Sequence, residues 1–137
     1  MPETLEGLEQ RRWQLYQQLA TLGDFRPGMI SVNYRKCGKG NCACARSGHP
    51  GHGPQYLWNT TQQGKSQAQN LRLGPELEKV ERELETYQRF LALCRELVEV
   101  NTRICQARPL GELPEEAELE QLKKKLQKKY SKRRSKR

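Results

Sequence analysis

The sequence predicts a mainly helical α+β fold, in which helices frame a small three-stranded antiparallel sheet. Leucines recur at helical spacing in residues 1–24, and apolar residues recur every seven positions in residues 75–108. The intervening residues 25–74 contain short runs in which apolar and polar side chains alternate. With 137 residues, of which 34% are hydrophobic, the chain has room for a modest core drawn mainly from helices.

The first predicted element is an amphipathic N-terminal helix within residues 1–24. Its leucines follow a 3-4 spacing with Arg12 at the one missing position: Leu5, Leu8, Leu15, Leu19 and Leu22. Gly23-Asp24 ends this pattern, and the Pro27-Gly28 pair that follows is typical of a turn.

Residues 25–74 are predicted to form the sheet. Ile30, Val32 and Tyr34 alternate with polar residues and indicate a first strand. The runs "QYLWNTT" and "SQAQNLRL" indicate two more strands, joined by a turn at residues 62–65. A loop rich in Cys, His, Gly and Pro separates the first two strands.

Residues 75–108 are predicted to form one long, coiled-coil-like helix. One apolar stripe runs along its whole length: Leu77, Val80, Leu84, Tyr87, Leu91, Cys94, Val98, Asn101 and Cys105. A second stripe occupies only the C-terminal half: Phe90, Leu93, Leu97, Val100 and Ile104. We therefore expect this half to be enclosed by other helices, with Cys94 and Cys105 in the core.

Two polar residues interrupt these helical stripes. Arg12 and Asn101 either fix register and partner number, as polar residues do in helical seams, or simply point outward. One short N-terminal helix cannot cover both stripes of the long helix. A homodimer or a partner protein is therefore expected to bind through the helices.

Residues 109–137 are predicted to form a linker, a basic helix and a tail. Pro109, Gly111 and Pro114 interrupt the chain, after which Leu119, Leu122 and Leu126 recur at helical spacing. The acidic start and basic end of this segment suit the helix dipole. Beyond Lys128 the sequence is of low complexity, and we expect disorder there unless a partner is bound.

Positive charge is concentrated in two zones of this chain of net charge +9. Residues 25–75 contain seven Lys or Arg and no acidic residue, and residues 121–137 contain ten and again none. Such zones favour a polyanion, because neutralising phosphates releases counterions. We expect nucleic acid, DNA or RNA. The alternative is a solvated basic tail that aids solubility.

The candidate phosphate contacts lie in both zones: Arg35, Lys36, Lys39, Arg46, Lys65, Lys128, Lys129, Lys132, Arg133 and Arg134. Trp58 is the candidate for base stacking, since polar residues follow it, and the alternative for the sheet aromatics is packing in a small core. A membrane is not expected as a partner. No apolar run is long enough to span one, and the tail offers only Leu126 and Tyr130 as anchors.

The twenty-residue run "CGKGNCACARSGHPGHGPQY" holds three of the five cysteines and both histidines. The N-terminal sequence lacks a secretory pattern, so we expect a cytoplasmic protein with reduced thiols. Three thiolates and one imidazole suit tetrahedral zinc, and Cys37, Cys42 and Cys44 with His49 or His52 supply them. A metal-free loop and a reactive thiol centre are the alternatives. Because only one residue separates Cys42 from Cys44, a shared ion requires a local turn there.

No enzymatic activity is expected. Residues 25–75 contain no carboxylate, so a metal-dependent nuclease or transposase centre has no ligands there. A thiol nucleophile beside His49 or His52 would lack a nearby acid to orient the imidazole.

The stretches "SVNYRKCGKGNCACA", "HGPQYLW" and "GKSQAQNLRLGPELEKVERELETYQRF" resemble a family of small uncharacterised prokaryotic proteins. Its pattern is CGKxxCxCA, then HGPY, a GKT-type turn and a long helix, and the resemblance covers residues 29–106. The matching positions are Cys37, Gly38, Lys39, Cys42, Cys44, Ala45, His52, Gly53 and Pro54. The departures are Gln55 ahead of Tyr56, and Ser66 in the turn.

This resemblance implies that His52, and not His49, is the fourth metal ligand, because His49 lies outside the pattern. Members of the family occur beside transposase genes, which implies a mobile-element setting. We therefore expect a non-enzymatic nucleic-acid-binding accessory protein of a mobile-element or defence system. The alternative is a protein–protein adaptor with a structural zinc loop and a helical oligomerisation surface.

Overall fold

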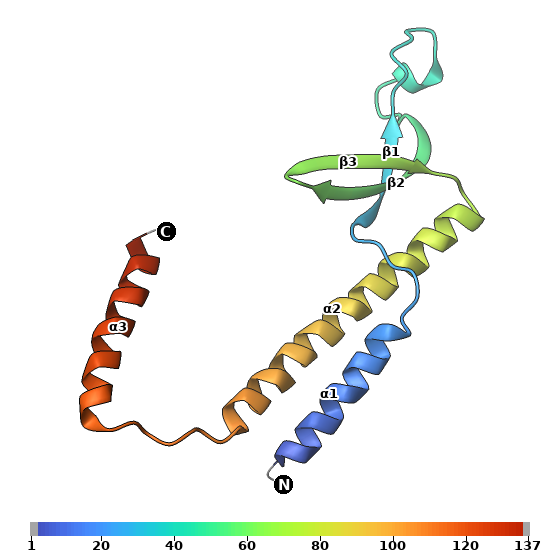
Figure 1. The fold of residues 1–137 in the computed structure, drawn as a ribbon. Coiled ribbons are helices and arrows are strands. Elements are labelled where there is room, and N and C mark those ends of the chain that lie inside the picture. Colours follow the sequence, from blue (N-terminus) through green and yellow to red (C-terminus); the bar gives the residue numbers. More distant parts are fainter. Residues whose placement is uncertain (1–2, 136–137) are drawn as a thin grey trace. The chain divides into compact units, whose positions relative to one another are not determined.

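The structure is a computed structural model that describes the backbone of residues 3–135 and the side chains of residues 3–131. In chain order its elements are α1 (Leu5–Ala20), β1 (Met29–Arg35), the short 3-10 helix η1 (Ala43–Ala45), β2 (His52–Gln62), β3 (Lys65–Leu71), α2 (Pro75–Ala107) and α3 (Glu116–Ser135) (Figure 1). This confirms the expected α+β fold. The chain divides into two compact units, residues 1–106 and residues 107–137. No helix of the described residues is long and apolar enough to cross a membrane.

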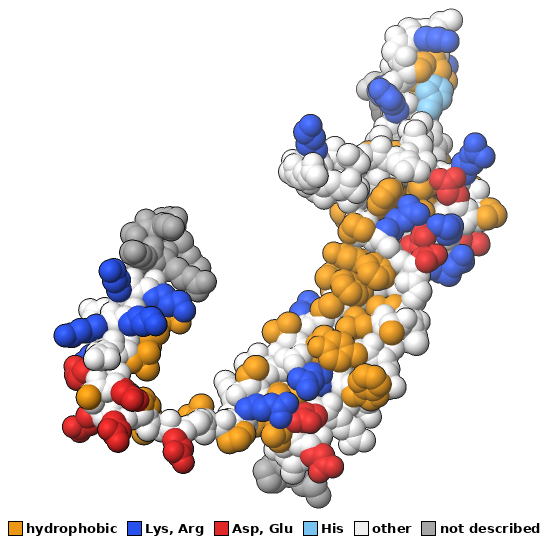
Figure 2. Space-filling model, in the orientation of Figure 1, with side chains coloured by type: hydrophobic (Ala, Val, Ile, Leu, Met, Phe, Trp, Pro, Cys, Tyr) orange, Lys and Arg blue, Asp and Glu red, His pale blue; other side chains and the backbone are white. Residues whose placement is uncertain are grey.

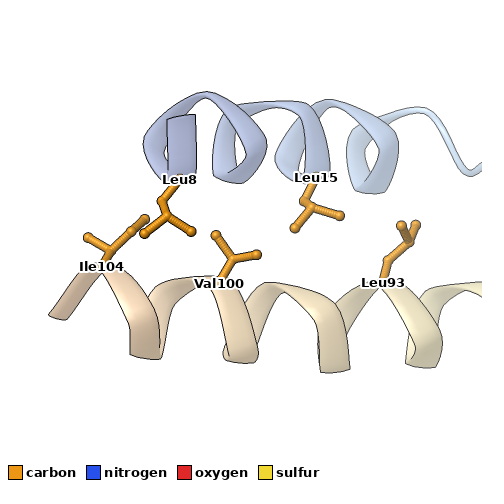
Figure 3. Close-up of a cluster of buried hydrophobic side chains, with 5 residues drawn as sticks. All are labelled: Leu8, Leu15, Leu93, Val100 and Ile104. Carbon is orange, nitrogen blue, oxygen red and sulfur yellow. The ribbon is translucent and has the colours of Figure 1, made fainter. Parts of the chain in front are cut away.

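α1 and α2 pack as an antiparallel pair, called the helical hairpin from this point, although the sheet lies between them in the chain (Figure 1). The side chain of Thr4 caps α1 by accepting a hydrogen bond of 3.0 Å from the backbone N–H of Gly7. Leu8 and Leu15 of α1 point toward α2 and pack among three of its apolar side chains, Leu93, Val100 and Ile104 (Figure 3). All five are buried, and Leu15 is completely excluded from solvent. The hydrophobic effect therefore holds this pair of helices together.

Polar contacts fix the register of the hairpin along the edges of this core. The guanidinium of Arg12 donates a hydrogen bond of 3.2 Å to Oδ1 of Asn101, so the two residues that interrupt the apolar stripes pair with each other. Arg11 donates to the carboxylate of Glu96.

The structure corrects one expectation about α2. α1 covers the shorter of the two apolar stripes, and the C-terminal half of the longer one is not enclosed by the described residues. Val98 is 66% exposed, Cys94 is half-buried and Cys105, expected in the core, is exposed. A single neighbouring helix covers one face of α2, and the two stripes lie on different faces.

The sheet has the order β1-β2-β3, and both pairings are antiparallel. Tyr56 lies opposite Val32 on one side and opposite Leu71 on the other. Gln63 and Gly64 both have positive φ, 51° and 77°, as a two-residue hairpin turn requires. The expected turn is thus confirmed. β2 begins earlier than the sequence suggested, because His52 already pairs with Arg35.

The segment between α1 and β1 attaches the sheet to α2. The ring of Phe25 stacks on that of Phe90 at a centroid distance of 4.6 Å. The backbone N–H of Arg26 donates to the carbonyl oxygen of Glu83, and its guanidinium lies 2.8 Å from the Glu83 carboxylate. Lys79 bonds the other oxygen of this buried carboxylate at 2.7 Å. An ion-pair network therefore joins the start of β1 to α2.

The structure continues α3 to Ser135, although the sequence beyond Lys128 favours disorder, and residues 136–137 lie outside the described residues. Lys, Arg and Gln are good helix formers, and the acidic residues Glu116 and Glu118 stand in the first turn. Figure 2 shows acidic side chains at the start of α3 and basic ones along its later turns.

Candidate metal centre

The Cys/His loop, residues 36–54, brings four potential ligands together from three local structures. Cys37 follows β1, Cys42 and Cys44 belong to the turn around η1, and His52 opens β2. The backbone N–H of Cys42 donates to Lys39, and that of Ala45 donates to Cys42. These bonds supply the tight turn that a shared ion requires of Cys42 and Cys44.

The spacing of the four ligand atoms fits a metal ion. One ligand atom from each of Cys37, Cys42, Cys44 and His52 lies within 4.8 Å of all the others. The Sγ atoms of Cys37 and Cys44 are 3.5 Å apart, and Sγ of Cys42 is 3.2 Å from Nε2 of His52. Ligands about 2.3 Å from a tetrahedral zinc ion lie about 3.8 Å from one another. The four residues can therefore hold a metal ion, and their donor set is compatible with zinc.

The two histidines have different hydrogen-bond partners. His52 points its Nε2 at the Cys42 thiol. Nδ1 of the half-buried His49 instead accepts a hydrogen bond of 2.9 Å from the backbone N–H of Gly51. His49 thus helps to shape the turn before β2, and His52 belongs to the cluster.

Two glycines, one on each side of His52, allow its side chain to lie in the cluster. Gly51 has φ 105°, and a Cβ there would lie 2.8 Å from the backbone of Arg35. Gly53 has φ 141°, and a Cβ there would lie 2.8 Å from the carbonyl oxygen of Asn33. Side chains at either position would push β2 away from β1. The glycines thereby keep His52 against the end of β1, next to the cysteines.

The thiols differ in their protonation. The backbone N–H of Lys39 and hydrogen bonds from His52 and Cys44 lower the pKa of Cys37 to about 6. The backbone N–H of Cys37 acts to lower the pKa of Cys44, but burial and the thiols of Cys37 and Cys42 outweigh it, so that the pKa is raised. The lowered pKa favours the thiolate of Cys37 at neutral pH, and the thiolate is the form that binds metals.

Basic side chains surround this cluster without acidic neighbours in the loop. Arg35, Lys36, Lys39 and Arg46 are all exposed. On the face drawn in Figure 2, the loop at the top carries Lys and Arg side chains and no acidic one. Lys65 is exposed at the turn between β2 and β3. The structure thus gathers four of the candidate phosphate contacts around one loop and its strand end.

Trp58 is more constrained than the sequence indicated. Its indole N–H donates a hydrogen bond of 2.8 Å to the carbonyl oxygen of Pro27, and the guanidinium of Arg26 lies 4.6 Å from the centre of its ring. The ring is half-buried. Sequence reasoning missed this role of Arg26. The only available signal was its position as a basic residue just before a Pro-Gly turn.

The remaining candidates lie on α3. Lys128 and Lys129 are exposed, and Nζ of Lys129 lies 5.7 Å from the centre of the Tyr130 ring. Lys132, Arg133 and Arg134 belong to the same helix, but their side chains lie outside the described residues.

Comparison with known proteins agrees with the expectation of an uncharacterised family. Neither the curated proteins nor the solved structures contain a match to the chain. A family model described as "Domain of unknown function (DUF6788)" matches residues 5–83. The match includes α1, the whole sheet and the four clustered ligands, and it ends in the first third of α2. The chain therefore belongs to the DUF6788 family.

Proposed function

We propose that this protein is a non-enzymatic nucleic-acid-binding accessory protein, whose Cys/His loop presents basic side chains to phosphates. The observation that carries the proposal is the exposure of Arg35, Lys36, Lys39 and Arg46 around one loop that has no acidic residue. Each phosphate neutralised by such a cation releases counterions from the polyanion. Exposed cations without acidic neighbours in the loop are available for that exchange.

In this proposal the ion held by Cys37, Cys42, Cys44 and His52 is zinc, and its role is structural. A loop with few buried side chains gains its conformation from the bonds to the ion. Three thiolates also leave a zinc site with net negative charge, which the neighbouring Lys39 and Arg46 offset. The metal would thus fix the backbone from which the basic side chains project.

The absence of carboxylates from positions 25–75 leaves no ligands there for a two-metal catalytic centre, which supports a binding role. The basic α3 would add phosphate contacts through Lys128 and Lys129. The family resemblance at the Cys/Gly motif suggests a mobile-element or defence system as the setting.

One observation favours a second candidate function, an adaptor that binds another protein or a second copy of the chain. Trp13 and Tyr16 of α1 are 63% and 47% exposed, and Val98 of α2 is 66% exposed. Large apolar side chains on a helical hairpin are typical of surfaces that pack against further helices. The two roles are compatible, because the helices and the loop are separate surfaces.

Retention on immobilised DNA and RNA at rising salt tests the nucleic-acid proposal. Lys36→Ala/Lys39→Ala/Arg46→Ala should weaken retention and make its salt dependence shallower. The matched control removes three exposed cations from α2 instead, as Arg82→Ala/Arg89→Ala/Arg95→Ala. Equal reductions in the two variants would show that only net charge matters. No retention of the native protein on either polymer at low salt would favour the adaptor.

A further inference from the structure

A hollow on the sheet lies beside Trp58 and is lined by five residues of β2 and β3: Trp58, Thr60, Gln67, Ala68 and Gln69. Register explains why they meet. Trp58 pairs with Gln69 and Thr60 pairs with Gln67, so these four side chains share one face of the sheet. The lining thus combines an aromatic ring with two amides and a hydroxyl, and it contains no charged side chain.

The Trp58 ring is held in place from the side opposite β3. The segment that leads into β1 supplies the guanidinium of Arg26 and the carbonyl oxygen of Pro27, and a Cβ at Gly28 would lie 2.6 Å from the indole nitrogen. These contacts come from the β1 side, whereas the hollow is lined by β2 and β3 alone. The ring is therefore a fixed wall of the hollow.

The amide groups of Gln67 and Gln69 complete the site. Both residues are exposed on the edge strand, and neither side chain forms a hydrogen bond or an ion pair with the described part of the chain. Each amide offers a donor and an acceptor, the combination that pairs with the edge of a nucleobase. Thr60, which pairs with Gln67 across the strands, is buried.

We propose that this hollow binds an unpaired nucleobase, stacked against Trp58 and hydrogen-bonded to Gln67 or Gln69. This inference rests on the proposed nucleic-acid binding and adds the class of ligand, a single-stranded nucleic acid. A base inside a duplex cannot offer both its face and its pairing edge, whereas an unpaired base offers both. Lys65, at the end of the same hairpin, is placed to contact the backbone of such a strand.

The test uses the full-length Trp13→Phe protein, in which Trp58 is the only tryptophan. A single-stranded oligonucleotide should quench Trp58 fluorescence, while the same sequence as a duplex and an abasic oligomer of equal length should not. The abasic oligomer offers phosphates without bases, so it separates the hollow from the basic loop.

Variants of β3 give the second readout. Gln67→Ala/Gln69→Ala should lower affinity for the single strand and leave affinity for the abasic oligomer unchanged. The matched control, Ser66→Ala/Asn70→Ala, changes the opposite face of the same strand and should have no effect. Trp58→Ala should lower affinity for the single strand about 5- to 150-fold, the range of ~1–3 kcal/mol for one stacked base.

Four results would overturn the inference. Binding of the single strand without quenching would remove the base site and leave phosphate binding intact. Equal quenching by the abasic oligomer would also rule out the base site. Equal losses of single-strand affinity in Gln67→Ala/Gln69→Ala and Ser66→Ala/Asn70→Ala would rule it out as well. No binding of any of the three polymers would contradict the proposed function together with this inference.

Discussion

The helical hairpin and the Cys/His loop of this protein are stabilised in different ways. The hairpin buries five apolar side chains between α1 and α2. In residues 36–54, by contrast, only Cys44 and Gly51 are buried. Apolar burial therefore accounts for the hairpin, whereas the loop has little apolar burial and instead brings together four potential metal ligands.

The largest expected effect is on the loop. Cys44→Ser should remove a ligand and abolish protection from hydrogen exchange in residues 36–54, while α1 and α2 keep theirs. Cys105→Ser is the control, since Cys105 is exposed on α2 and should leave both regions unchanged. Hydrogen exchange followed by mass spectrometry reads both regions at once. Retained protection in the loop of Cys44→Ser would show that the loop holds its conformation without this ligand.

A core substitution should affect the hairpin and spare the loop. Val100→Ala is expected to lower the free energy of unfolding by about 1–3 kcal/mol, because Val100 is buried between the helices. Val98→Ala removes the same atoms from a side chain that is 66% exposed, and should cost about 0.5 kcal/mol or less. Denaturant unfolding followed by helical circular dichroism measures both. Equal costs would mean that the surface of Val98 is covered in solution.

A smaller effect is expected where the sheet joins α2. The hydrogen bond from Lys79, supported by the charge of Arg26, lowers the pKa of Glu83 from its ordinary value of 4.5. Since the lowered pKa belongs to the folded state, this stabilisation is complete above pH 4.5 and is lost as pH falls through the lower value. Glu83→Gln should cost about 1–2 kcal/mol at neutral pH.

The pH dependence distinguishes this role from simple packing. The difference in unfolding free energy between native protein and Glu83→Gln should stay constant from pH 7 to about pH 5 and shrink below pH 4.5. A difference that does not change with pH would show that the charge of Glu83 is not what joins the sheet to α2.

The smallest effect on stability is expected from the C-terminal end. Deleting residues 128–137 removes seven Lys or Arg and should leave the unfolding of residues 1–106 unchanged. On the proposed function, the slope of log affinity for nucleic acid against log salt should become shallower by about 0.7–0.9 for each phosphate that the truncated protein no longer neutralises. Affinity and slope equal to those of the native protein would exclude α3 from binding.

The difference between the two regions also explains what could be predicted from the sequence. Leu8, Leu15 and the stripe of Leu93, Val100 and Ile104 follow helical periodicity, so the hairpin could be predicted from local pattern. The choice between two stripes of α2 could not, because it depends on which face α1 covers. The end of α3 is ambiguous in the sequence, because its low complexity favours disorder while its Lys and Arg residues have high helix propensity.

For the candidate site, residue types and spacing indicated the three cysteines as ligands. On those grounds alone, either His49 or His52 could be the fourth ligand. The structure resolves the choice through contacts between residues distant in sequence, since Gly51 and Gly53 pack against the end of β1. Arg26 and its contact with Trp58 could not be predicted, because 32 positions separate them. Gln67 and Gln69 become visible as part of a hollow only once the strand register is known.

The most direct test of the proposed zinc site is the mass of the native protein. Electrospray mass spectrometry under non-denaturing conditions, on protein purified without added metal, should show one zinc ion per chain, and Cys44→Ser should lose it. A metal-free native mass, from protein whose loop is protected from hydrogen exchange as strongly as α2, would show that the loop holds its conformation without a metal ion.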